Sequence, residues 1–344
     1  MDSYDKILEI TGEITGETIA PNAEGAVDPS PSLAVKPSRP AVLVVMVGET
    51  TRSASWQLAG YSRETNPQLS ELQIISIPRV EACGTSTDVS LPCMMSRIGR
   101  SDYNRDRILS EEQLPSLLNR AGANVLWIDN QSGCKGACTG VSSRATTPNP
   151  QDCPNGECGD RVFLSELKGE LGKLPADRPT VLFLHMMGSH GPAYSLRSDK
   201  ARKLFEPECT DADLKSCSRE SVMNAYDNSV RETDYVLASL IRMLKDTSGS
   251  IDSALVYVSD HGESLGEGGL YLHGAPYWMA PKEQTEVPMV LWMNSGFEKT
   301  FSINRSKLEK NAAGRVTHEN LYHTVLGLLN VKSTTYVPTY DLTH

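Results

Sequence analysis

Five continuous apolar runs, separated by segments with helical periodicity, constrain the fold of this chain most strongly. The runs cover residues 41–47, 123–128, 180–186, 254–259 and 287–292. Because they do not alternate apolar with polar residues, they are typical of strands buried on both faces of a parallel sheet. Apolar residues at helical spacing predict a helix over about 219–246. A Ser110–Gln113 capping box predicts another helix over 110–121, so helices are expected between the strands. The alternation predicts an α/β sandwich with a mostly parallel central sheet.

Side chains that can bind a metal follow three of these strands. Right-handed crossovers bring the loops after parallel strands to one edge of the sheet, so we expect these residues to gather there. Carboxylate oxygens mixed with imidazole nitrogens suit zinc. A single Asp-His pair is more often a cap, but three clusters at three strand ends predict a metal site. The candidates are Glu49, His190, Asp260 and His261, with His273 twelve residues after His261.

A hydroxyl-rich loop lies between Cys83 and Cys93 and contains Thr85, Ser86 and Thr87. Such residues are ordinarily helix N-caps. A hydroxyl at a helix start also faces free backbone N–H groups and the positive end of the helix dipole, which favours an alkoxide and an incoming phosphate. The pattern alone leaves all three open as the nucleophile.

The eight cysteines form four close pairs with no cysteine left over. Eight reduced thiols or a zinc-ribbon set are the alternatives, but the spacing C-x-x-C of structural zinc sites is missing. Glycine, asparagine, proline and aspartate crowd the pairs, which indicates disulfides in surface loops and an oxidising compartment. The predicted pairs are Cys83–Cys93, Cys134–Cys138, Cys153–Cys158 and Cys209–Cys217.

Charge and hydropathy exclude other classes of protein. With a net charge of −10, the chain lacks the excess of basic residues that is typical of nucleic-acid-binding proteins. The longest clean apolar run has seven residues (41–47), whereas a transmembrane helix needs about 20. Residues 1–20 lack the pattern of a signal peptide. The proline-rich stretch 20–40 indicates a linker.

Six motifs resemble the phosphoethanolamine–lipid A transferases, which include the mobilised colistin-resistance (MCR) enzymes. They occur in the order found in that family and span roughly residues 40–335. They are VGETTR (47–52), GYSRETNP (60–67), CGTST with PC (83–93), NAYDN (224–228), SDHGESLGE (259–267) and YLHG with APKEQ (271–284).

The resemblance implies an alkaline-phosphatase/sulfatase-like α/β/α sandwich and a zinc-dependent active site. Thr87 would be the residue that becomes phosphoethanolaminylated, so the resemblance selects one of the three hydroxyls as the nucleophile. His190 and His273 match positions that hold a second zinc or handle substrate phosphate, and Lys135 matches a substrate-side lysine. Arg219 replaces a histidine of some members; it can bind phosphate but not zinc. The implied ligands of the tightly bound zinc are Glu49, Thr87, Asp260 and His261.

The resemblance also implies substrates and a location. The donor would be phosphatidylethanolamine, the acceptor a phosphate of lipid A at the membrane surface, and the outcome resistance to polymyxins such as colistin. Residues 1–39 would be a linker after a missing N-terminal transmembrane domain, and residues 40–344 a monomeric periplasmic catalytic domain at the inner membrane.

The alternatives are another lipid phosphotransferase, a sulfatase or a phosphodiesterase of the same fold, and a binding domain that has lost activity. Several acidic and histidine residues receive structural interpretations. Glu263 and Glu267 are interpreted as helix-start or loop acids rather than ligands, and His185 as a core histidine with satisfied hydrogen bonds. The remaining histidines have no cluster around them in the sequence: His318, His323 and His344.

Overall fold

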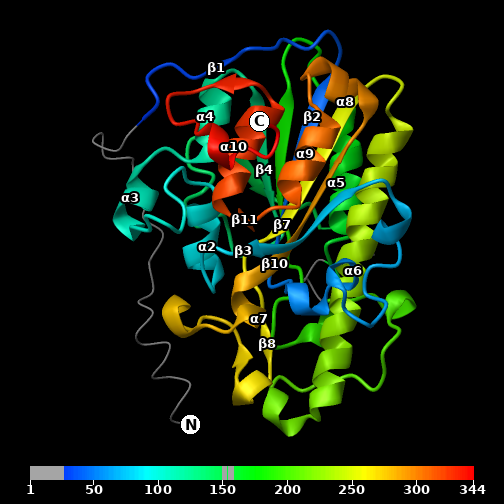
Figure 1. Ribbon diagram of the computed structural model, residues 1–344. Helices are drawn as coiled ribbons and strands as arrows, with labels where there is room; N and C mark the ends of the chain where they lie inside the picture. Colours follow the sequence, from blue (N-terminus) through cyan, green and yellow to red (C-terminus); the bar gives the residue numbers. More distant parts are fainter. Residues whose placement is uncertain (1–26, 149–152, 154–158) are drawn as a thin grey trace.

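An eight-stranded sheet forms the centre of the molecule in a computed structural model that describes residues 27–148, 153 and 159–344 (Figure 1). The strand order is β11-β3-β10-β7-β2-β6-β4-β5. Strand β10 runs antiparallel to both of its neighbours, and the other pairs are parallel. The strands are β2 (Ala41–Gly48), β3 (Ile75–Glu81), β4 (Asn124–Asp129), β5 (Ser142–Ala145), β6 (Thr180–His185), β7 (Asp252–Ser259), β10 (Glu286–Met293) and β11 (Val316–Thr317).

All five predicted strands are present, and the mostly parallel α/β sheet is confirmed. Every residue of β2 is buried, as its continuous apolar run indicates. Leu43 and Val45 belong to one core, while Val44 and Met46 belong to another on the opposite face. Alternate side chains of one strand therefore fill two hydrophobic cores, and helices cover both faces of the sheet.

Helices α5 and α6 cover one face, and α2, α4, α8, α9 and α10 contribute to the core on the other (Figure 1). The prediction for the longest helix is confirmed: α6 begins directly after Ser218, whose side chain accepts from the backbone N–H of Ser221. The helices are α2 (Thr87–Met94), α3 (Arg105–Ser110), α4 (Leu114–Arg120), α5 (Val162–Leu171), α6 (Arg219–Asp246), α7 (Lys282–Thr285), α8 (Ser295–Thr300), α9 (Arg305–Ala312) and α10 (Glu319–Leu328).

The predicted capping box at 110–121 is wrong. Ser110 ends α3, and its hydroxyl donates to the carbonyl of Arg107. Gln113 is the N-cap of α4 without a side-chain capping bond, because its amide donates instead to the carbonyl of Ile108. The helix predicted over 110–121 is therefore present as the shorter α4, and Ser110 is the last residue of the preceding helix α3.

Part of the proline-rich N-terminal stretch packs along the domain. Strand β1 (Ser32–Leu33) pairs antiparallel with β12 (Val331–Lys332). The Arg39 guanidinium donates to the Asp252 carboxylate at the start of β7. Residues 1–26 lie outside the described residues, so the connection of this stretch to a membrane segment stays a prediction.

Three of the four predicted disulfides lie within the described residues and are confirmed: Cys83–Cys93, Cys134–Cys138 and Cys209–Cys217. Cys153 is also disulfide-bonded, and its expected partner Cys158 lies outside the described residues. In the described part of the chain, no helix has both the length and the apolarity to cross a bilayer.

Acidification should destabilise the fold through His323, which is buried on α10 and accepts a hydrogen bond at Nδ1 from the backbone N–H of Val337, 3.2 Å away. Burial lowers the pKa of His323 from 6.5 to about 4. The unfolded chain therefore takes up a proton near pH 6.5 while the folded chain does not. Stability falls as the pH drops through this window, by about 2 kcal/mol at pH 5.

Urea unfolding of the metal-free protein at pH 7.5 and pH 5 measures this loss. In His323→Asn the amide oxygen can replace the Nδ1 acceptor without titrating, so this variant should lose about 2 kcal/mol less than the wild type between the two pH values. An equal loss in both proteins contradicts the assignment.

Candidate metal centre and nucleophile

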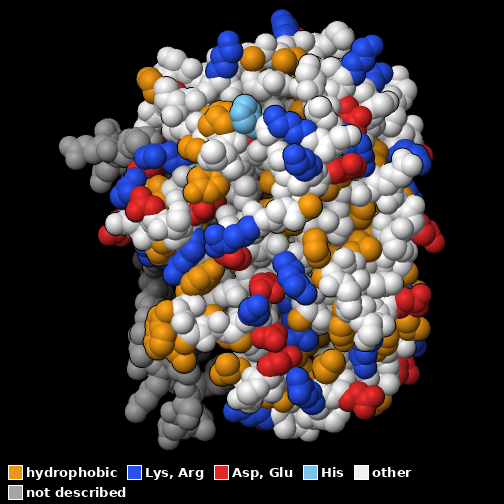
Figure 2. Space-filling model, in the orientation of Figure 1, with side chains coloured by type: hydrophobic (Ala, Val, Ile, Leu, Met, Phe, Trp, Pro, Cys, Tyr) orange, Lys and Arg blue, Asp and Glu red, His pale blue; other side chains and the backbone are white. Residues whose placement is uncertain are grey.

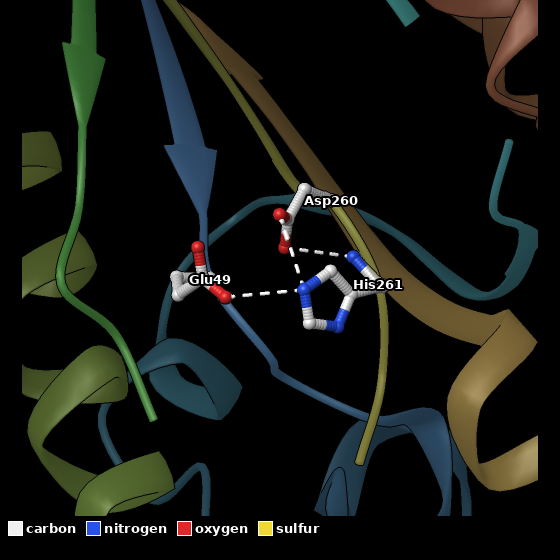
Figure 3. A group of neighbouring side chains, drawn as sticks. All are labelled: Glu49, Asp260 and His261. Atoms are coloured by element: carbon white, nitrogen blue, oxygen red, sulfur yellow. Dashed lines mark hydrogen bonds and ion pairs between the residues drawn. The ribbon is translucent and has the colours of Figure 1, made fainter. Parts of the chain in front are cut away.

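The neighbouring parallel strands β2 and β7 bring three buried ligand side chains together. Gly48 lies opposite Ser259 in the register, so Glu49, which directly follows β2, meets Asp260 and His261. All three side chains are fully buried. His261 Nε2 lies 3.2 Å from Glu49 Oε1 and 3.5 Å from Asp260 Oδ2. Figure 3 shows the three side chains converging from the ends of the two strands.

The donor set fits a divalent cation. Asp260 Oδ1 accepts from the backbone N–H groups of His261 and Thr50, whereas Oδ2 is buried and finds no hydrogen-bond partner in the described part of the chain. The ring of His261 donates from Nδ1 to the carbonyl of Gly262, 2.9 Å away. Its Nε2 lone pair then faces the two carboxylates, as in a metal-ligating histidine. Within the described ranges this is the one group of three or more such side chains.

The pKa shifts of Asp260 and His261 indicate an excess of negative charge in this cluster. Burial and the neighbouring charge of Glu49 raise the pKa of Asp260 from 3.8 to about 6. Although burial opposes it, Asp260 and Glu49 raise the pKa of His261 to about 10. Two buried carboxylates thus draw a proton onto the imidazole. A bound cation could replace that proton, because buried charges are stable only when paired or coordinated.

Thr87 directs its hydroxyl into this cluster. It is the first residue of α2, and Oγ1 donates to Glu49 Oε2 at 2.9 Å. The same oxygen lies 3.4 Å from His261 Nε2. A hydroxyl at this position lies both beside the metal ligands and at the positive end of a helix.

The two other hydroxyls of the loop have different partners. Thr85 donates to the carbonyl of Ala275, and Ser86 donates to the exposed carboxylate of Asp88. The side-chain geometry therefore distinguishes Thr87 from its neighbours, which the sequence pattern alone could not do.

His190 and His273 lie beside the cluster. The rings of His261 and His273 have centroids 4.4 Å apart, and those of His190 and His273 are 5.6 Å apart. His190 follows β6, and burial lowers its pKa. The structure thus brings together the three strand ends that the sequence predicted.

Glu263 lies in the loop after β7 and outside the metal-capable group, which agrees with its interpretation as a helix-start or loop acid rather than a ligand. Its side chain is fully buried, and His273 Nδ1 lies 3.2 Å from Glu263 Oε1, so the carboxylate orients the imidazole. The hairpin β8 (Ser264–Leu265) and β9 (Tyr271–Leu272) pairs antiparallel, which places the residues flanking it opposite each other. The glycine-rich segment 266–269 between the two strands is the sequence signal for this hairpin.

Lys135 and Arg219 lie less directly at the site. Lys135 Nζ donates to Ser132 Oγ in the loop after β4. Arg219, 59% exposed, begins α6 and lies 3.5 Å from Glu267, which is also paired with the buried Arg52. Glu267 is therefore an ion-pair partner rather than a member of the cluster.

Sequence reasoning missed Gln131, which follows β4. Its side-chain amide donates to Glu49 Oε2, 3.0 Å away. Asp129 supports this loop, because its Oδ1 accepts from the backbone N–H groups of Gln131 and Gly133. His185 is fully buried, as its interpretation as a core histidine predicts, and its Nδ1 binds the other oxygen of Asp129 at 3.0 Å. Its Nε2 has no hydrogen-bond partner among the described residues, so only one ring nitrogen is satisfied. No local motif marks a glutamine that reaches the end of β2 from the end of β4, across the intervening strand β6.

His318 also lies close to the site, although the sequence shows no cluster around it. Its Nδ1 accepts from the backbone N–H of Cys83 at 3.0 Å, and Nε2 lies 2.9 Å from the carbonyl of Ser259. The Ser90 hydroxyl beside it donates to the carbonyl of Asp260. One buried imidazole thereby joins the loop of the hydroxyls to the strand that ends in the ligands.

The family model described as Sulfatase matches residues 41–331. The chain belongs to the sulfatase family. It is 40% identical over 302 residues to phosphoethanolamine transferase EptA of Escherichia coli strain K12, covering 87% of this chain and 55% of that protein. The chain thus spans little more than half the length of this curated relative.

Two solved structures give the same result. The soluble domain of lipooligosaccharide phosphoethanolamine transferase A from Neisseria meningitidis matches with a TM-score of 0.84 at 40% identity, covering 93% of this chain and 95% of that one. The integral membrane form of that transferase matches with a TM-score of 0.85 at 40% identity, covering 90% and 60%. The resemblance to phosphoethanolamine transferases and the alkaline-phosphatase/sulfatase-like fold are confirmed.

Removal of a ligand side chain should abolish tight metal binding. We expect Glu49→Gln and Asp260→Asn each to lower the affinity for zinc by more than about 100-fold, since loss of a residue that only hydrogen-bonds to a metal ligand already costs about 10–100-fold. Metal content after dialysis and competition with a chelator measure the change. Glu267→Gln is the matched control, because Glu267 pairs with arginines outside the cluster. Zinc binding by Asp260→Asn at the wild-type level contradicts the site.

Replacement of His318 by alanine should leave the backbone N–H of Cys83 and the carbonyl of Ser259 buried without their partner. Each unpaired group costs about 1–3 kcal/mol, so the free energy of unfolding should fall by about 2–4 kcal/mol. Urea denaturation measures this. The exposed His344→Ala is the control and should change stability little; a similar small change in His318→Ala would refute the bridging contacts.

Proposed function

We propose that this chain is the catalytic domain of a zinc-dependent phosphoethanolamine transferase with Thr87 as its nucleophile. The donor is phosphatidylethanolamine and the acceptor is a phosphate of lipid A. The observation that carries the proposal is the hydrogen bond from Thr87 Oγ1 to Glu49 Oε2 inside the buried cluster with Asp260 and His261. The similarity to phosphoethanolamine transferases over most of the chain supports the headgroup that is transferred.

Glu49, Asp260 and His261, together with Thr87, would hold the zinc ion. The ion supplies positive charge that lowers the pKa of a nearby hydroxyl and offsets the charge of phosphate oxygens. His190 and His273 lie where they can contact a substrate phosphate or hold a second ion. Glu263 keeps His273 in position by binding its Nδ1, which leaves Nε2 for that contact.

The residues of this chain position the reacting groups for two successive displacements. Glu49 Oε2 orients the Thr87 hydroxyl, and the first-turn N–H groups of α2 face the incoming phosphate. In the first displacement a bond forms between Thr87 Oγ1 and phosphorus, and the bond to diacylglycerol breaks. The proton of the hydroxyl is taken up by the departing alkoxide. Phosphoryl transfer of this kind depends mainly on positioning and charge neutralisation.

In the second displacement a phosphate oxygen of lipid A attacks the phosphoethanolamine on Thr87. The bond from phosphorus to Thr87 Oγ1 breaks, and the leaving threonine oxygen takes up the proton that the acceptor phosphate monoanion loses. Lys135 can meet the anionic acceptor from the loop that Gln131 connects to Glu49. Arg219 contributes less in this arrangement, because its guanidinium lies near Glu267.

We propose that the domain acts as a monomer at the periplasmic face of the bacterial inner membrane, joined by residues 1–39 to a transmembrane domain. Its disulfides suit an oxidising compartment. The similar transferase of Neisseria meningitidis is described as an integral membrane protein. Modification of lipid A at this location would confer resistance to polymyxins such as colistin, because it lowers the negative charge that cationic peptides bind.

Incubation of the zinc-loaded protein with phosphatidylethanolamine, followed by intact mass and peptide mapping, tests the proposal. We expect a phosphoethanolamine adduct on the Thr87 peptide that disappears with chelator. Thr87→Ala should lower adduct formation by about 10³-fold or more, as loss of a nucleophile does elsewhere. Ser86→Ala should behave like the wild type, because Ser86 binds a surface aspartate.

The donor and acceptor are tested separately. Phosphatidylglycerol in place of phosphatidylethanolamine should give no adduct; an adduct of equal yield would indicate another lipid phosphotransferase of the same fold. Addition of lipid A to the loaded protein should remove the adduct and increase the mass of lipid A by one phosphoethanolamine. Wild-type adduct yield in Thr87→Ala would refute the nucleophile.

A further inference from the structure

Two adjacent apolar side chains protrude from the short 3-10 helix η9 (Tyr277–Met279). Trp278 is 84% exposed and Met279 is 57% exposed. The other three tryptophans of the chain, Trp56, Trp127 and Trp292, are at most 6% exposed. Single exposed apolar residues are common, but a tryptophan and a methionine presented side by side mark a surface that meets another apolar phase.

The segment that carries them is firmly held, so their exposure is not the result of a loose loop. The hydroxyl of Tyr277 donates to the carbonyl of Ala82 at 2.9 Å, and the guanidinium of Arg100 lies 3.8 Å from the Tyr277 ring centroid. The backbone N–H of Ala275 donates to Gln284 Oε1 at 3.1 Å. The chain on either side of Trp278 is fixed while its indole is left in solvent.

This segment is connected directly to the loop of the proposed nucleophile. The backbone N–H of Gly274 donates to the carbonyl of Thr85, and the Thr85 hydroxyl donates to the carbonyl of Ala275. Thr85 lies two residues before Thr87, and Gly274 directly follows His273. Whatever contacts Trp278 and Met279 is therefore held next to the reaction centre.

Further exposed apolar side chains come from the same end of the sheet. In the described part of the chain, eight large apolar residues are exposed, and five of them lie in the segments that follow β6 and β7. These five are Leu196, Leu204, Leu270, Trp278 and Met279. Figure 2 shows apolar side chains gathered at the lower left, where Figure 1 places the segment drawn in gold around η9.

We propose that Trp278 and Met279 enter the lipid interface of the membrane and thereby bring Thr87 to the headgroup of its donor. This rests on the proposed function, in which the donor is a membrane lipid. An indole has an apolar body and a polar N–H, and it is enriched where a protein meets the interface of a bilayer. Lys282, whose side chain is 83% exposed, follows three residues after Met279 and suits lipid phosphates.

A lipid surface fits this position better than a protein partner does. The acyl chains of the donor remain in the bilayer while its phosphorus reaches Thr87, so the surface around the nucleophile must approach the bilayer closely. A protein bound over Trp278 would instead cover the surface next to Thr85 and His273, from which the donor must reach Thr87. The apolar pair therefore serves to seat the site on the membrane.

The test compares the double variant Trp278→Ser/Met279→Ser with the wild type on two forms of the donor. One form is mixed vesicles of phosphatidylethanolamine and phosphatidylglycerol, and the other is short-chain dihexanoyl phosphatidylethanolamine dissolved as monomers. We expect the rate of adduct formation to fall by about tenfold or more on vesicles and to stay within about twofold on the soluble donor. Val337→Ser is the control, because Val337 is also exposed, at 40%, but lies near the C-terminus.

Tryptophan fluorescence gives an independent readout that needs no catalysis. Because the other three tryptophans are buried, a blue shift on addition of vesicles reports Trp278, and it should be absent in Trp278→Ser. Vesicle rates equal to the wild type, or an equal loss on both donor forms, would overturn the proposal. If the wild type forms no adduct with either donor, the proposed function fails, while the fluorescence shift still decides whether Trp278 enters the lipid.

Discussion

The register between β2 and β7 is the constraint on which the rest of the site depends. Because Gly48 pairs with Ser259, the residues that come next, Glu49 and Asp260, are forced together in the interior. Two buried carboxylates repel each other unless positive charge is supplied. His261 supplies part of it, and the free Oδ2 of Asp260 shows where a cation would complete it. The loops around the site are held by hydrogen bonds to this pair of strands.

Most of the architecture could be predicted from the sequence, because its signals are local. Five buried strands are continuous apolar runs, and α6 shows helical spacing along its whole length. The missed strands have weaker patterns: β3 has a mixed burial pattern at Ile75–Glu81, and β5 (Ser142–Ala145) is largely exposed. The capping box predicted at Ser110 is wrong because Ser110 is the last residue of α3, and the next helix, α4, starts only at Leu114.

The metal-capable residues could be predicted because they lie in the segments after strands, and the order of the strands in the sheet brings these segments close together. Contacts between residues far apart in the sequence could not be predicted in this way. His318 lies more than 200 residues from Cys83 along the chain, yet it binds that backbone N–H. Gln131 reaches Glu49 from a different strand end, and Glu263 reaches His273 through a hairpin. Such residues have no local signature, since only the tertiary structure determines which side chain they orient.

The disulfide between Cys83 and Cys93 has a consequence for how the proposed nucleophile is held. It runs from just before α2 to the last turn of that helix, which has eight residues and contains Pro92. A helix of this length does not persist alone in water. Glu49, Asp260 and His261 are built on the sheet and form when the chain folds. The disulfide ties the two ends of this short helix together, so its oxidation would help to keep the hydroxyl of Thr87, the proposed nucleophile, beside the cluster.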